Sequence, residues 1–104
     1  MKSVLLLGAL MMSVPAFASQ NLELAGDCKP KVEKALTGLG EGKAQVETVL
    51  NVNGKMITVA YTRTLPEGVV SGEANLVLKE TKEIARGSNV YMILCDVVSA
   101  EILN

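Results

Sequence analysis

The sequence predicts an α+β domain, with one amphipathic helix at about residues 28–39 packed on an antiparallel sheet of four or five strands. Three observations support this class. Apolar residues recur with helical spacing early in the chain. An Asn53-Gly54 pair, typical of β-hairpins, separates two alternating segments rich in β-branched residues. The remaining apolar segments are alternating or continuous, as expected of strands that share a sheet with the helix on one side.

The first 18 residues predict a cleaved signal peptide. Lys2 supplies a positive start, an apolar run covers residues 4–12, and Ala16-Phe17-Ala18 matches the A-x-A cleavage pattern. The apolar part is too short for a membrane-spanning helix, which needs about 20 residues. We therefore expect a secreted or periplasmic protein whose mature chain, residues 19–104, is a single small domain with no membrane attachment after cleavage.

The composition of the mature chain excludes several kinds of function. It contains no His and no Trp, and its only Phe leaves with the signal peptide. Loss of Lys2 leaves nine basic residues against eleven acidic ones, which is not the basic balance of a nucleic-acid-binding protein. Without His, the chain lacks the usual general base and the commonest metal ligand. We expect no catalytic, cofactor-binding or metal-binding residues, and no cofactor.

Cys28 and Cys95 are the only cysteines, and in an oxidising compartment we expect them to form a disulfide. They are too far apart for a Cys-x-x-Cys redox motif. A mature domain of this size buries only about 60–65% of its unfolded surface, so its stability is marginal. The bond closes a long loop, for which the chain-entropy estimate is about 4 kcal/mol. We expect the disulfide to be a main source of stability.

The N-terminal part of the mature chain predicts a short strand and then the helix. Residues 21–24 alternate between polar and apolar side chains, as in a strand. Asp27 stands at the N-cap position and Pro30 is tolerated in the first helical turn. Cys28 continues the apolar face of the helix, which has i, i+3, i+4, i+7 spacing and comprises Val32, Ala35, Leu36 and Leu39.

Residues 45–64 predict a β-hairpin that turns at Asn53-Gly54, because both central positions of a type I′ turn need positive φ. Pro66-Glu67-Gly68 predicts a further turn. A third strand is expected around residues 74–79. Residues 80–85 fit either a continuation of this strand or a helical turn.

The last segment, residues 90–98, is apolar at both parities except for Asp96, which suits a strand covered on both faces. Asp96 either reaches water near the strand end or pairs with Arg63 or Arg86. If Cys95 is bonded to the helix, the residues of its parity face the helix. Those of the other parity form a candidate interaction face: Val90, Met92, Leu94 and Val98.

Monomeric proteins rarely leave such an apolar row in water. Either the tail at residues 100–103 covers it or a second chain does, and we favour a homodimer or a protein partner. The sequence therefore predicts an exported, non-catalytic binding module, an inhibitor or an accessory subunit that acts through protein contacts. The alternative is a small hydrolase that uses carboxylates. The densest charge cluster, which contains Glu80 and Glu83, fits a solvated surface better than such a site.

Overall fold

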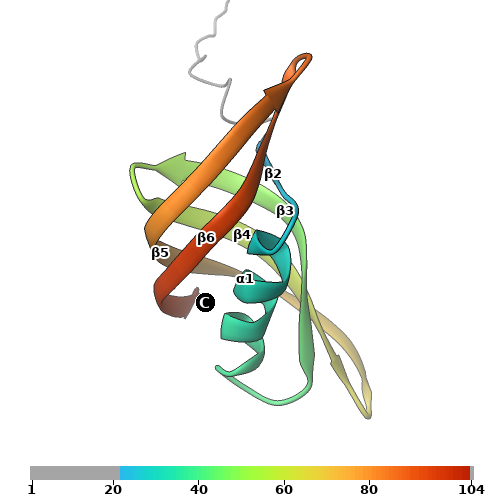
Figure 1. Cartoon of the computed structure of the whole chain (residues 1–104). Coiled ribbons are helices and arrows are strands. Elements are labelled where there is room, and N and C mark those ends of the chain that lie inside the picture. The colour runs from blue at the N-terminus through green and yellow to red at the C-terminus, as the bar shows by residue number, and fades with distance from the viewer. Residues whose placement is uncertain (1–21, 104) are drawn as a thin grey trace, which may run out of the picture.

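The computed structural model describes residues 22–103, which form five strands and one helix (Figure 1). The predicted signal peptide, residues 1–18, lies outside the described residues. The strand order in the sheet is β2-β6-β5-β4-β3; β2 runs parallel to β6, and the other neighbours are antiparallel. The elements are β2 (Leu22–Leu24), α1 (Cys28–Thr37), β3 (Lys43–Asn53), β4 (Met56–Leu65), β5 (Gly68–Arg86) and β6 (Asn89–Leu103).

The predicted class, an α+β domain with a helix at about residues 28–39 packed on an antiparallel sheet, is wrong. Strands make up 71% of the described residues, and the mixed sheet curls into a nearly closed barrel. The opening lies between the edge strands β2 and β3, and the helix contacts β3 and β6, the neighbour of β2 (Figure 1). The physical reason is the length of β5 and β6, 19 and 15 residues, and the bulges in their ladder. Bulges increase strand twist and bend a sheet toward closure.

The helix itself forms where its apolar spacing predicts, but it ends two residues earlier, at Thr37. Cys28, Val32 and Leu36 are its buried residues, as expected for one face of an amphipathic helix. Asp27 stands at the N-cap position, although its side chain makes no capping hydrogen bond. No helix within residues 22–103 is long and apolar enough to cross a membrane.

The predicted hairpin is confirmed, whereas the third strand, expected around residues 74–79, runs from Gly68 to Arg86. β3 and β4 form the predicted hairpin, in which Asn53 pairs with Met56 and Gly54 has a φ of 62°. Residues 66–67 form the turn before β5. Residues 80–85, which fitted two conformations, belong to β5.

The interior is filled almost entirely by aliphatic side chains. Among residues 22–103, Tyr61 is the one aromatic residue of the core, and it is 7% exposed. The largest fully buried side chains come from α1 and from β4, β5 and β6; they include Leu36, Ile57, Leu76, Leu78 and Met92.

Candidate functional site

The predicted disulfide between Cys28 and Cys95 is present. The two Cα atoms are 5.0 Å apart, and both residues are fully buried. A backbone hydrogen bond joins the same two segments: the Asp27 N–H donates to the Ile93 carbonyl at 3.1 Å. The first residue of α1 is thus joined to the middle of β6. The bond is consistent with an oxidising extracellular environment.

A bulge in β6 changes which side chains of this strand face the core. Met92 and Leu94 pair with consecutive residues of β5, which leaves Ile93 as an extra residue. An extra residue reverses the alternation of a strand, because successive side chains point to opposite faces. Met92 and Cys95 consequently both point inward, although their sequence positions differ in parity.

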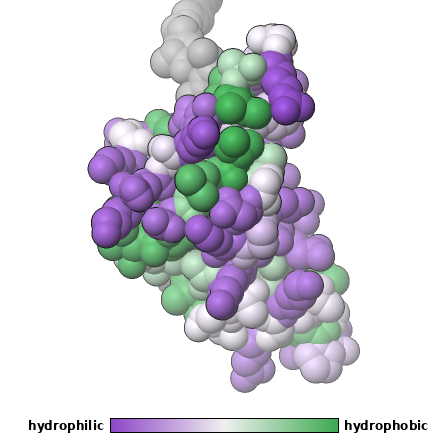
Figure 2. All heavy atoms as spheres, in the orientation of Figure 1, coloured by the Kyte–Doolittle hydropathy of each residue, from purple (hydrophilic) through white to green (hydrophobic). Residues whose placement is uncertain are grey.

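The predicted interaction face is therefore divided between core and surface. Met92 is 1% exposed and belongs to the core, and Val90 is partly buried against it. Leu94 and Val98 are 41% and 62% exposed. Apolar residues on the face shown in Figure 2 gather over β2 and β6. The four residues do not form one row, and binding through Leu94 and Val98 stays a prediction.

Asp96 lies at the surface. Its carboxylate accepts a hydrogen bond from the Lys31 ammonium at 3.2 Å. This bond, more than the Coulombic attraction of Asp27 and Asp96, raises the pKa of Lys31. Of the two partners proposed for Asp96, Arg63 is buried and bonded to backbone carbonyls elsewhere. The carboxylate thus belongs to a surface ion pair on α1 and β6.

A nearly closed sheet still has strand edges, and the edge of β3 is shielded by the helix. The Ala44 N–H donates to the Thr37 hydroxyl at 3.0 Å, and the Val46 N–H donates to the Glu33 carboxylate at 2.9 Å. Register shifts at Glu47 and Leu50 interrupt the ladder farther along. Side-chain acceptors and bulges are common means of blocking an exposed edge.

Glu33→Ala is expected to lower the free energy of unfolding by about 1 kcal/mol, because the half-buried Val46 N–H loses its acceptor. Urea unfolding measures the loss, and faster hydrogen exchange of the Val46 amide locates it. Glu80→Ala, at an exposed position of β5, is the matched control and should change neither quantity. An unchanged Val46 exchange rate in Glu33→Ala would contradict the shielding role of this carboxylate.

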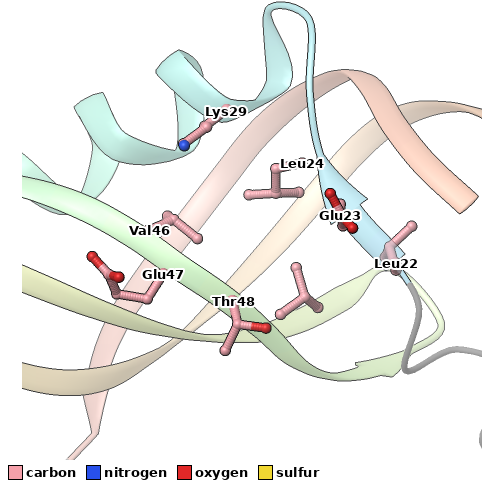
Figure 3. A pocket seen from close by; sticks show the side chains of 8 residues that line it. Leu22, Glu23, Leu24, Lys29, Val46, Glu47 and Thr48 are labelled. Atoms are coloured by element: carbon pink, nitrogen blue, oxygen red, sulfur yellow. The ribbon is translucent and has the colours of Figure 1, made fainter. Parts of the chain in front are cut away.

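A cavity of about 360 Å³ lies where β2 faces β3 across the opening of the barrel (Figure 3). Figure 3 shows Glu23 on β2, Glu47 on β3 and Lys29 on α1 around it. These three charged side chains are exposed, and the Thr62 hydroxyl donates to the Glu47 carboxylate at 3.1 Å. The volume is at the lower end of that of small-molecule pockets. The other lining residues are Leu22, Leu24, Val46, Thr48 and Val49.

The first five residues of β5, Gly68–Gly72, form a second edge, which we call the β5 edge. β6 ends at Leu103, opposite Glu73, so within residues 22–103 the β5 edge pairs only with β4. Val69 is 66% exposed and Val70 49%. A hollow of about 460 Å³, lined by Ser71, Gly72, Glu73 and Leu103, lies where β6 stops.

The β5 edge lacks the devices that shield β3. Residues 68–72 carry no charge and contain no Pro, and the β4–β5 register runs without a shift. The β4–β5 hairpin projects from the body of the molecule (Figure 1). Such an edge is a template for pairing with another strand.

Sequence reasoning missed this edge because it began the third strand near residue 74. The signal in the sequence was the uncharged run Gly68–Gly72 directly after a turn. Within residues 22–103, no group of three or more His, Cys, Asp or Glu side chains is arranged to hold a metal ion. Comparison with known protein families, with characterised proteins and with solved structures finds no match to this chain.

Proposed function

We propose that this protein is an exported, non-catalytic binding module, an inhibitor or an accessory subunit, that acts through contacts with another protein. The observation that carries the proposal is the exposed and uncharged β5 edge with Val69 and Val70. Export to the periplasm or the medium is supported by the signal-peptide pattern in residues 1–18 and by the buried disulfide.

The contrast between the two edges favours a binding role for one of them. At the edge of β3, the N–H groups of Ala44 and Val46 donate hydrogen bonds to the side chains of Thr37 and Glu33. Proteins usually protect exposed edges in this way, because an open apolar edge promotes aggregation. An unprotected edge on a small exported domain is best explained by a partner that covers it.

The alternative, a hydrolase that uses carboxylates, has one observation in its favour: Glu23 and Glu47 line the same cavity. Both side chains are exposed, whereas the general acid of such enzymes is typically a carboxyl group in an apolar pocket. The exposed apolar edge has no role in that chemistry. The binding function therefore accounts for more of the molecule.

Site-specific photocrosslinking tests the proposal. A photoreactive side chain in place of Val69, in the protein exported by its own host, is expected to give a covalent adduct with a different polypeptide. The same side chain in place of Lys55, in the exposed β3–β4 turn, is the control and should give little adduct. If no position on the surface yields an adduct with another protein, the proposed function is wrong.

A further inference from the structure

We infer that the β5 edge binds an extended segment of the partner as an added strand, and that this segment has a β-branched or apolar centre flanked by Lys or Arg. The inference rests on the proposed function and specifies its partner. Three features of the β5 edge support it: backbone groups that do not pair with β4, the hollow beside Leu103, and the charges near the edge.

The free backbone groups belong to Val69 and Ser71. Leu65 and Gly68 pair across a two-residue turn, a position at which hairpin residues exchange hydrogen bonds. Antiparallel pairs alternate between bonded and non-bonded, so the N–H and C=O groups of Val69 and Ser71 point away from β4. They face the side on which Glu73 pairs with Leu103.

An added strand at this edge would continue the line of β6. A hollow lined by Ser71, Gly72, Glu73 and Leu103 lies beside this edge, where such a strand would pack. Val69 and Val70 point to opposite faces of the sheet. An added strand would therefore contact an exposed valine on each of its faces, which favours β-branched side chains at its centre.

On β5, on β6 and in the β4–β5 turn, the charges beside the edge are negative. On β4, Arg63 pairs with Val70 but is buried and bonded to backbone carbonyls, and Lys43 lies one strand farther away, on β3. The β4–β5 turn, residues 68–78 and residues 97–103 contain three glutamates, Glu67, Glu73 and Glu101, and no basic residue. Lys or Arg beside the centre of the added strand would pair with these carboxylates.

A second copy of this chain fits less well, because pairing centred on Val70 brings like charges opposite each other. Antiparallel pairing of two β5 edges about Val70 places Glu67 of one copy opposite Glu73 of the other, at both ends of the contact. Like charges directly opposite each other destabilise strand pairing. The same glutamates that repel a second copy attract a basic partner.

Peptide probes test the inference directly. The mature, disulfide-bonded protein is titrated into a fluorescent seven-residue peptide of alternating Thr and Val with Lys at both ends, and anisotropy reports binding. We expect this peptide to bind at least about fivefold more tightly than the same peptide with Glu at both ends. Glu73→Lys should reduce or reverse the preference, and added salt should weaken it.

Two changes test strand pairing itself. Ser71→Pro removes an N–H that faces the free edge, at a position where β4 pairing does not need it, and should weaken binding about tenfold. Ser71→Thr keeps the N–H and should bind as the wild type does. The second change is made in the peptide. N-methylation of its Val residues removes N–H donors, and it should abolish binding to the unchanged protein.

Several results would overturn the inference. One is equal binding of the Lys-ended and Glu-ended peptides, and another is unchanged binding of the N-methylated peptide. A wild-type dimer that Ser71→Pro dissociates would identify a second copy as the occupant. If crosslinking through Val69 captures a partner and Ser71→Pro leaves the yield unchanged, the binding function stands and strand addition is wrong.

Discussion

Cys28→Ala combined with Cys95→Ala is expected to lower the free energy of unfolding by about 2–5 kcal/mol. The bond joins residues 67 positions apart, so it restricts the unfolded conformations of the segment that forms β3, β4 and β5. It also anchors the first residue of α1 to β6 across the opening of the barrel. Alanine is chosen because both sites are fully buried, and a serine hydroxyl there would add an unpaired polar group.

Urea unfolding of the oxidised protein and of the double variant measures this loss. The unchanged protein in excess reductant is the control, because it breaks the same bond without altering the packing. We expect it to be destabilised by an amount similar to that of the double variant. If the reduced protein unfolds at the same urea concentration as the oxidised one, the bond adds nothing to the stability of the barrel.

The elements that the sequence predicted correctly depend on near neighbours in the chain. The helix follows from the spacing of Val32 and Leu36, and the β3–β4 hairpin follows from Gly54, whose φ is positive. The disulfide followed from the compartment and the cysteine count. Each of these features is set by local chemistry or by a single covalent possibility.

Closure of the sheet has no comparable local signal. It depends on the parallel pairing of Leu22–Leu24 with β6, between segments far apart in the sequence. It depends also on bulges, and the extra residue Ile93 reverses the alternation on which the predicted face relied. The residues of that face were apolar as predicted, but their orientation was set by the ladder with β5. Sequence periodicity does not show where a bulge lies.

The candidate site was missed for a related reason. Within residues 22–103, the pairing of β5 with β6 extends only to Glu73 opposite Leu103, which leaves Gly68–Gly72 paired with β4 alone. The composition of Gly68–Gly72 is compatible with a loop. Because the segment directly follows the turn at Pro66-Glu67, it was interpreted as part of that turn. The pairing of these residues with β4 shows that they form a strand, and the β5–β6 register, which begins at Glu73, shows that within residues 22–103 its other side is open.

Arg63 connects the barrel to the helix in a way that the sequence did not indicate. Its side chain is 7% exposed, and its guanidinium donates to the carbonyls of Leu36, Glu41 and Gly42 at 2.7, 3.0 and 3.1 Å. The guanidinium also lies 5.7 Å from the centre of the Tyr61 ring. Carbonyls at the C-terminal end of a helix carry partial negative charge. Arg63 therefore closes the end of α1 and holds the following loop against β4.

Arg63→Met is expected to lower the free energy of unfolding by about 2–4 kcal/mol, because three carbonyls lose a charged donor while the aliphatic packing is largely kept. Arg63→Lys retains the charge, but a single ammonium lacks the planar fork that reaches three acceptors, so an intermediate loss is expected. Urea unfolding measures both variants. Loosening of the helix end should also speed hydrogen exchange at Ala44, whose N–H is bonded to Thr37 in the last turn. Equal free energies of unfolding for Arg63→Met and the wild type would show that water replaces the guanidinium without loss of stability. The disulfide and the apolar face of the helix alone would then hold it in place.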